Sequence, residues 1–172
     1  MGTGDWGLRW LMDLTPKRAS ESATEMVQVV LPNDANPLGF ILGGTVMHLI
    51  DIAGAIACHR HTRSLLVTAA VDGLQFLHSI KVGDLIILKS HVTCVFTTSL
   101  EVQVDVFSEE TLTGIRQMTS TAFLTFVAID REGTRIHVPP LVVETEEDKR
   151  VCEEAHRRRA ERLRRKEQAR KV

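Results

Sequence analysis

One long apolar segment constrains the fold of this chain more than any other feature of the sequence. Between Gly44 and about His61 the composition predicts a helix, and apolar residues cover most of its surface: Val46, Met47, Leu49, Ile50, Ile52, Ala53, Ile56 and Ala57. A helix that is apolar almost all round is buried. We therefore expect this helix at the centre of the domain.

Strand-forming residues precede and follow the helix. A short strand over residues 26–31 ends in the turn residues Pro32-Asn33-Asp34. After the helix, four segments rich in Val, Thr, Ile and Phe predict an antiparallel meander: residues 65–76, 85–96, 99–107 and 116–129. Since only the helix is available to cover the concave face of this sheet, the sheet must curl around it, which makes an α+β fold.

A chain of 172 residues has the length of one domain with one substantial core. Residues 1–22 read as an appended arm, whose Trp6 and Trp10 we expect to dock on the body. The body spans residues 23–143. Residues 144–172 form a charged, helix-forming tail without a wide apolar stripe, which we expect to be solvated or docked on a partner.

Bulk composition points to no particular partner. Hydrophobic residues make up 44% of the chain and charged residues 25%, with a formal net charge of −1, as in average globular proteins. No apolar run approaches the roughly 20 residues of a membrane span. The three cysteines, Cys58, Cys94 and Cys152, are widely spaced and odd in number, and no basic-then-apolar leader opens the sequence. We therefore expect a reducing, cytoplasmic location.

Asn36 and Asp51 flank a glycine pair, Gly43-Gly44, at the expected start of the helix. Backbone N–H groups at this positive end of a helix stabilise a developing oxyanion. An amide and a carboxylate nearby can hold and activate a water, or attack a carbonyl. On local grounds alone, Asn36 is by default a turn residue and Asp51 a structural carboxylate at an oligomer contact. Buried carboxylates are costly, however, and are often functional.

Several separate motifs, in order and at compatible spacing, closely resemble those of the acyl-CoA hydrolases of the hotdog-fold thioesterase family. They are Asp34-Ala35-Asn36-Pro37-Leu38-Gly39, Gly43-Gly44, Leu49-Ile50-Asp51-Ile52-Ala53-Gly54-Ala55, Val67-Thr68-Ala69-Ala70-Val71-Asp72, Val82-Gly83-Asp84, Thr98-Ser99-Leu100-Glu101-Val102 and Pro139-Pro140. The resemblance covers roughly residues 24–150. It implies a sheet wrapped around a central helix, and two subunits or tandem repeats paired into one continuous sheet with active sites at their interface. Hexamers built as trimers of dimers are common in this family.

The resemblance also implies a reaction: acyl-CoA and water give free fatty acid and CoA, a step of fatty acid metabolism with no cofactor beyond the CoA of the substrate. The catalytic residues of the family match Asn36 and Asp51. Asp51 would act as general base or as nucleophile, Asn36 would orient the water or the carbonyl, and Gly43-Gly44 would polarise the thioester. Because relatives build each site from two subunits, we expect Asn36 and Asp51 to meet across the interface.

Three further residues are candidates for binding CoA by resemblance: Thr98 and Ser99 in a strand turn, and more weakly Thr68. His48, three residues before Asp51, could form a dyad with it, although a histidine satisfied in the interface is the commoner arrangement. The run Cys58-His59-Arg60-His61 lacks a second ligand cluster, so we expect no metal there, and cations that complement the helix dipole instead.

Residues 157–171 contain nine Lys or Arg against two Glu. Such a run is most often a solvated helix face; it could also meet CoA phosphates or, less often, nucleic acid, which strong salt dependence would reveal. We expect no nucleic-acid partner.

Two other functions stay open. A hotdog hydratase or dehydratase would use a His paired with a carboxylate in motifs that are not found here, and a non-catalytic acyl-CoA-binding protein would not need an intact Asp51. Acyl-chain preference depends on tunnel depth, for which the candidate side chains are Leu38, Phe40, Ile41, Met47 and Phe76.

Overall fold

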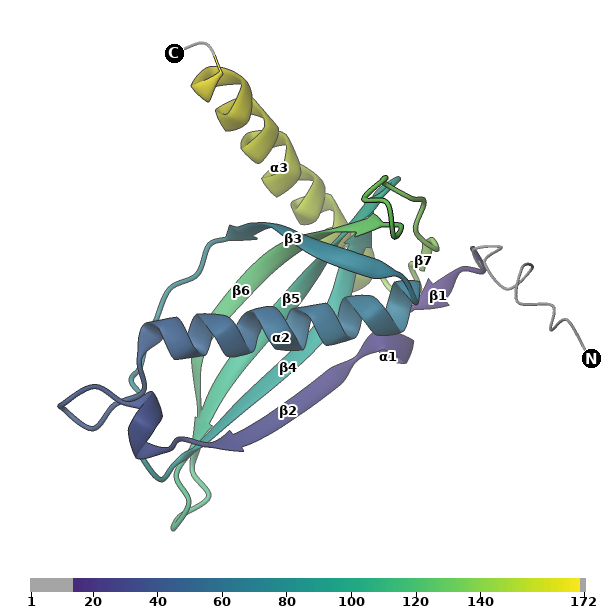
Figure 1. Cartoon of the computed structure of the whole chain (residues 1–172). Coiled ribbons are helices and arrows are strands. Elements are labelled where there is room, and N and C mark those ends of the chain that lie inside the picture. Colours follow the sequence, from purple (N-terminus) through teal and green to yellow (C-terminus); the bar gives the residue numbers. More distant parts are fainter. Residues whose placement is uncertain (1–13, 171–172) are drawn as a thin grey trace, which may run out of the picture.

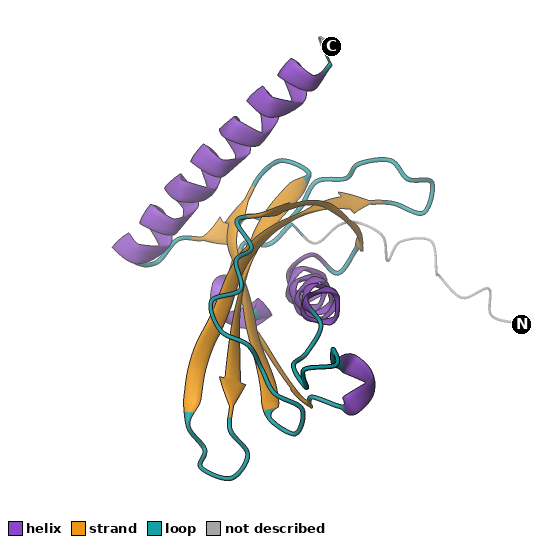
Figure 2. Ribbon diagram, turned by 90° about the vertical axis from the view of Figure 1, so that its left-hand side faces the viewer, coloured by secondary structure: helices purple, strands orange, loops and turns teal. Residues whose placement is uncertain are grey.

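The computed structural model describes residues 14–170, so Trp6 and Trp10 lie outside the described residues. A five-stranded antiparallel sheet has the order β2-β4-β5-β6-β3, and its strands are β2 (Thr24–Val29), β3 (Leu65–Asp72), β4 (Leu85–Val95), β5 (Ser99–Glu109) and β6 (Arg116–Ile129). The sheet curls around the helix α2 (Gly43–Thr62), which Figure 2 shows end-on inside the curve. This is the expected α+β hotdog arrangement.

The expected meander is correct for β4, β5 and β6 but wrong for β3. That strand pairs with β6, from Leu65 opposite Ile129 to Asp72 opposite Phe123, and so forms an edge of the sheet. Short turns join β4, β5 and β6, whereas the longer segment of residues 73–84 separates β3 from β4. Strand β4 already has β2 and β5 as its two neighbours, so β3 cannot pair with it. The strand also ends before residue 76, because Gly73 adopts a φ of +67° that breaks the extended chain.

Helix α2 packs closely on the sheet through Gly54. A Cβ atom at this position would lie 3.1 Å from Val102 Cγ1 and 3.2 Å from Phe126 Cε2, and both of those side chains are buried. The buried face of the helix carries Val46, Leu49, Ile50, Ala53, Ala57 and Cys58. We expected a helix buried on nearly all sides, but in the single chain only this face is buried: Met47 is 50% exposed and His48 is also exposed.

Part of the expected N-terminal arm is tied to the body. The short strand β1 (Lys17–Arg18) pairs in parallel with β7 (Leu141–Val142), and the one-turn helix α1 (Ala19–Ser22) follows it. The 3-10 turn η1 (Pro32–Asp34) then separates β2 from the loop that leads to α2. No helix among residues 14–170 is both long enough and apolar enough to cross a membrane.

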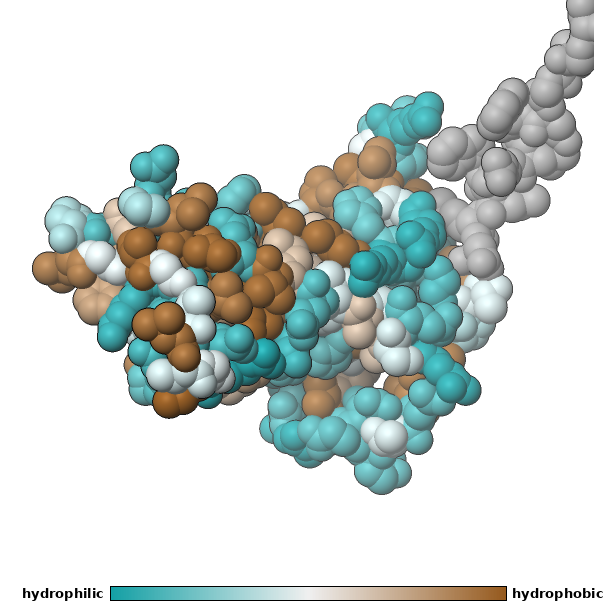
Figure 3. Space-filling model, turned by 90° about the horizontal axis from the view of Figure 1, so that it is seen from below, coloured by the Kyte–Doolittle hydropathy of each residue, from teal (hydrophilic) through white to brown (hydrophobic). Residues whose placement is uncertain are grey.

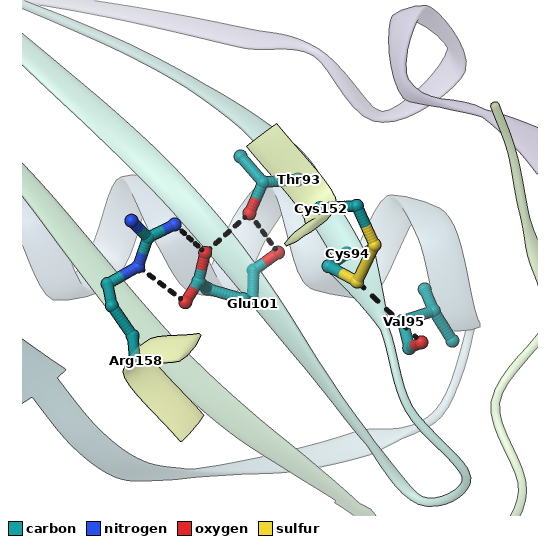
Figure 4. Close-up of a disulfide and its surroundings, with 6 residues drawn as sticks. All are labelled: Thr93, Cys94, Val95, Glu101, Cys152 and Arg158. Carbon is teal, nitrogen blue, oxygen red and sulfur yellow. Dashed lines mark hydrogen bonds and ion pairs between the residues drawn. A yellow bond between two sulfur atoms is a disulfide. The ribbon is translucent and has the colours of Figure 1, made fainter. Parts of the chain in front are cut away.

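The charged C-terminal segment forms the helix α3 (Glu146–Ala169), which begins with a capping box between Thr145 and Asp148. It lies on the side of the sheet opposite α2, and its distal turns project beyond the sheet (Figures 1 and 2). Arg158 donates to both carboxylate oxygens of Glu101, at 2.8 and 3.0 Å, and Glu101 is 1% exposed (Figure 4). The tail therefore docks on its own sheet, through these polar contacts and a small apolar cluster of Ala155 and Cys152 with Phe96 and Cys94, in place of a wide apolar stripe.

The cysteines do not all remain free. Cys152 of α3 forms a disulfide with Cys94 of β4, across 58 residues of sequence (Figure 4). Cys58 is buried and unpaired. Sequence spacing alone gave no signal for this pair, because the fold brings the two residues together. The cytoplasmic location stays a prediction.

Candidate active site

The N-terminus of α2 presents free backbone donors. Leu42 occupies the N-cap position and makes no side-chain capping bond, and the first backbone bond of the helix runs from Val46 N to Leu42 O at 3.1 Å. The N–H groups of Gly43, Gly44 and Thr45 therefore have no acceptor within the helix. Both glycines are exposed, and a Cβ atom at Gly44 would meet nothing within 4 Å. A negatively charged oxygen can therefore approach these N–H groups closely and be stabilised by them.

Asn36 organises the loop before α2. Its Oδ1 accepts from Leu38 N at 3.0 Å and from Phe40 N at 3.2 Å, and its own N–H donates to Phe40 O at 2.8 Å. These are the bonds of the turn that the local sequence predicts. Since Oδ1 accepts both side-chain bonds, the Nδ2 amide is the part of Asn36 that can donate to a ligand.

A cavity of about 340 Å³ lies beside this helix terminus. Asn36 and Gly43 are among its lining residues, and its apolar walls are formed by Phe40, Ile41, Val46, Phe76 and Leu77. The ring of Phe76 is 3.3 Å from where a Cβ atom of Gly43 would lie. Figure 3 shows apolar side chains gathered at the end of the molecule where α2 begins. The cavity joins an apolar lining to polar groups at one end, as small-molecule sites do.

Asp51 lies in the middle of α2 and is half-buried. Its Oδ1 accepts a 2.7 Å hydrogen bond from Thr68 Oγ1 of β3. The bond of Asp51 is therefore to Thr68 and not to His48, which points to the exposed side of the helix. Sequence reasoning considered Thr68 only as a weak CoA-binding candidate. The sequence signals only that β3 follows α2 directly; that Thr68 reaches Asp51 depends on the register of β3 beside the helix, which no local pattern reports.

Asn36 and Asp51 are not joined within one chain. Asp51 is eight residues beyond Gly43 on the helix, an axial separation of about 12 Å. Among residues 14–170 no hydrogen bond links the two side chains. Asp51 instead lies next to the open edge strand β3 and the exposed part of α2. A meeting of Asn36 and Asp51 across an interface stays a prediction.

Thr98 and Ser99 lie at the other end of the molecule from Gly43. In the turn between β4 and β5, Thr98 O accepts a hydrogen bond from Ala128 N, and Ser99 O accepts one from Phe96 N. Thr97 O accepts from Val138 N, next to Pro139, whose carbonyl contacts His61 in the last turn of α2. A single chain therefore does not bring these two candidates to the cavity beside Asn36, and their role stays a prediction.

The histidines at the C-terminal end of α2 each have separate contacts. His61 is fully buried, with Nε2 2.9 Å from Pro139 O, and His59 Nδ1 is 2.9 Å from Ser64 O. Burial raises the pKa of the Cys58 thiol, which keeps it protonated. Among residues 14–170 these side chains do not converge as metal ligands; the group that does is Cys94, Cys152 and His156, whose two sulfurs are bonded to each other.

Comparison with known proteins identifies the family of this chain. The Thioesterase superfamily profile matches residues 38–115. The chain is 41% identical over 146 residues to the uncharacterized acyl-CoA thioester hydrolase YkhA of Bacillus subtilis, and the match covers 85% of each chain. It is 33% identical over 141 residues to the human cytosolic acyl coenzyme A thioester hydrolase, but spans 37% of that protein's length.

Solved structures give the same result. A hexameric acyl-CoA thioesterase superposes with a TM-score of 0.83 at 40% identity, covering 88% of this chain and 97% of that one. The acyl-CoA hydrolase of Staphylococcus aureus, solved with butyryl coenzyme A and coenzyme A, superposes with a TM-score of 0.82 at 32% identity, covering 90% and 94%. That enzyme has also been solved as alanine variants of an aspartate, a threonine and an asparagine. The chain thus belongs to the hotdog-fold acyl-CoA hydrolases of the thioesterase superfamily, and is a thioester hydrolase.

Proposed function

We propose that this protein hydrolyses fatty acyl-CoA to free fatty acid and CoA, with Asp51 and Asn36 as its catalytic residues. The observation that carries the proposal is the hydrogen bond from Thr68 to Asp51, since it fixes a carboxylate at the open side of the central helix. A hydratase would call for a histidine beside the carboxylate, and the bonded partner of Asp51 is a hydroxyl.

The Staphylococcus aureus variants support this choice of residues. In that enzyme the altered asparagine and aspartate are 15 residues apart and the altered threonine follows the aspartate by 17. Asn36, Asp51 and Thr68 are the same three residue types at the same two separations. A shared spacing of three polar residues at equivalent places of one fold favours a shared role.

The chemistry then divides between the two ends of the site. The N–H groups of Gly43 and Gly44 bind the thioester oxygen as it becomes an oxyanion. On one route Asp51 takes a proton from water, whose oxygen attacks the carbonyl carbon. On the other, Asp51 itself attacks and water then hydrolyses the resulting anhydride. On both routes the C–S bond breaks, one proton of the water ends on the CoA sulfur, and the fatty acid leaves with the Asp51 carboxylate regenerated.

The assembly follows from the distance between these groups. Because Gly43 is about 12 Å along the helix from Asp51, and Asn36 lies in the loop before the helix, we propose that the cavity end of one subunit faces Asp51 and Thr68 of another. A dimer is then the smallest active unit. The hexameric relative favours further assembly of such dimers into a hexamer. Thr98 and Ser99 would contact CoA from a neighbouring part of the same assembly.

The test is to incubate the purified protein with acyl-CoAs of increasing chain length and to measure free CoA thiol. We expect turnover by the wild type and losses of about 10²–10⁴-fold for Asp51→Asn and Asn36→Ala. Glu146→Gln, whose side chain is 94% exposed on α3, is the matched control and should keep full activity. No thiol release from any chain length would contradict the proposed reaction, while full activity of both site variants would contradict the residue assignment.

A further inference from the structure

Helix α3 crosses the outer face of the sheet and contacts four strands in the order in which they lie. Cys152 is bonded to Cys94 of β4, and Arg158 pairs with Glu101 of β5. The Arg158 guanidinium also lies 3.7 Å from the ring centroid of Phe123 on β6. One turn later, Arg162 Nη1 donates to Asp72 Oδ2 of β3 at 2.5 Å. With buried Ala155 between the first two, Cys152, Arg158 and Arg162 follow one another at intervals of three, three and four residues, so one face of α3 spans the sheet up to its open edge.

Asp72 is the last residue of β3, and its side chain and that of Thr68 reach opposite faces of the sheet. Residues four apart on a regular strand share a face. Here the register shifts between Thr68 and Ala70, which reverses the alternation. As a result Thr68 bonds to Asp51 on the inner side, and Asp72 bonds to Arg162 on the outer side. One short strand therefore carries contacts to both helices.

The segment that follows Asp72 forms a wall of the cavity. Gly73, with its φ of +67°, turns the chain out of the strand. Residues 76–79 then line the cavity, and the Phe76 ring packs against Gly43 at the start of α2. Leu77 N donates to Thr119 O at 2.8 Å, but Phe76 and Leu77 are 51% and 61% exposed. The position of this wall thus depends on where β3 ends.

We propose that Arg162 is a positioning residue for the acyl-binding cavity. Its ion pair with Asp72 fixes the end of β3. The end of β3 in turn sets the position of residues 73–79, which form the cavity wall that carries Phe76. Both side chains of the pair are 24% exposed, so water screens the pair only in part. The inference rests on the proposed function, in that the cavity beside Gly43 takes the acyl chain. It gives the C-terminal helix a role in substrate selection.

The test compares Arg162→Ala with Arg162→Lys, which keeps the charge, and with Arg165→Ala as the matched control. Arg165 is 77% exposed and pairs with Glu161 on its own helix. For Arg162→Ala we expect KM for long-chain acyl-CoA to rise about three- to tenfold, with kcat and the short-chain KM within about twofold of the wild type. Arg162→Lys should restore most of the loss, and the control should show none.

A double-mutant cycle with Asp72→Asn separates positioning from simple loss of stability. If Arg162 acts through Asp72, Arg162→Ala has no further effect on KM in the Asp72→Asn protein. A full additional rise in KM in that background would overturn the proposal. So would a uniform fall of kcat at every chain length with a lower melting temperature, which is the signature of a merely structural contact.

Hydrogen exchange gives a readout that does not need catalysis. Amides of residues 74–79 should exchange faster in Arg162→Ala than in the wild type or in Arg165→Ala, with the α2 amides unchanged. Unchanged exchange in this segment would overturn the positioning role even if the enzyme is active. If the wild type releases no CoA but exchange still responds, the proposed function fails while the mechanical link from α3 to the cavity wall stands.

Discussion

Thr68 Oγ1 lies 2.7 Å from Asp51 Oδ1, which joins the edge strand of the sheet to the central helix. The hydroxyl donates and the carboxylate accepts, so one oxygen of Asp51 is held and the other is left to face a substrate or water. A carboxylate fixed in this way does not have to be reoriented during the reaction.

Removing the Thr68 hydroxyl should therefore slow hydrolysis without unfolding the protein. A hydrogen bond to a charged group is worth about 1.5–3 kcal/mol, so Thr68→Val should lower kcat/KM by about 10–100-fold. Thr68→Ser keeps the hydroxyl and should stay within about fivefold of the wild type. Steady-state kinetics with one acyl-CoA measures both. Equal activity of the Val and Ser variants would show that the bond does not matter to the reaction.

The open edge of β3 should be the dimer contact. Leu65, Val67 and Val71 on this strand are 51%, 45% and 51% exposed, which is unusual for apolar residues along an unpaired edge. Val67→Lys should reduce the mass measured by analytical ultracentrifugation and abolish hydrolysis together. Val27→Lys, on the opposite edge strand β2 and 54% exposed, is the matched control for added charge. If Val67→Lys leaves the mass unchanged, subunits do not pair along β3.

His61 should make stability depend on pH. Burial lowers its pKa from the ordinary value of 6.5, partly offset by the bond to Pro139. Because a carbonyl accepts, Nε2 carries the proton, and Nδ1 has no partner among residues 14–170. Below pH 6.5 His61 takes up a proton in the unfolded chain but not in the native protein, where its pKa is lower. The free energy of unfolding therefore decreases as the pH falls from 6.5 to the native pKa, by at most about 1.4 kcal/mol per pH unit.

Urea midpoints at about pH 7.5 and pH 5.5 measure this dependence. His61→Gln should flatten it, since an amide can donate to Pro139 O without titrating, whereas exposed His137→Gln should leave it unchanged. An unaltered slope in His61→Gln would show that other groups set the acid sensitivity.

Gly54→Ala should destabilise the protein although alanine favours helices. The helical preference gains about 1 kcal/mol, but the added methyl would press on buried Val102 and Phe126, and overpacking costs about 1–3 kcal/mol. Gly44→Ala, where a methyl meets nothing within 4 Å, is the control and should not lose stability. Thermal melts compare the two; a higher melting temperature for Gly54→Ala would mean that the helix can move away from the sheet.

Local patterns predicted most of the elements but not how they meet. Apolar spacing located α2 and runs of Val, Thr and Ile located β4 and β6, because these signals depend on neighbouring residues only. The pairing of β3 with β6 depends on which edge of the sheet is free, and no local pattern reports that. The docking of α3 was missed for a similar reason. Two of its contacts are made by arginines that read as solvated charges until Glu101 and Asp72 are placed opposite them, and its disulfide joins cysteines that are far apart in the sequence.

The candidate site divides in the same way. The resemblance named Asn36, Asp51 and the glycine pair, because motifs keep residue types in order along the chain. It did not indicate that Thr68 bonds to Asp51, which depends on the register of β3 beside α2. Nor can the distance between Asn36 and Asp51 in the proposed active dimer be taken from one chain, since that distance depends on how two subunits pair.

Complementation between inactive variants tests the shared site most directly. Asp51→Asn and Asn36→Ala should each be inactive alone. When the two chains are co-expressed so that they pair at random, half of the dimers combine one of each and regain one intact site of two. CoA release should then return to about one quarter of the wild-type rate. A mixture that stays inactive, while native mass spectrometry shows that mixed dimers have formed, would contradict a site built from Asn36 of one subunit and Asp51 of the other.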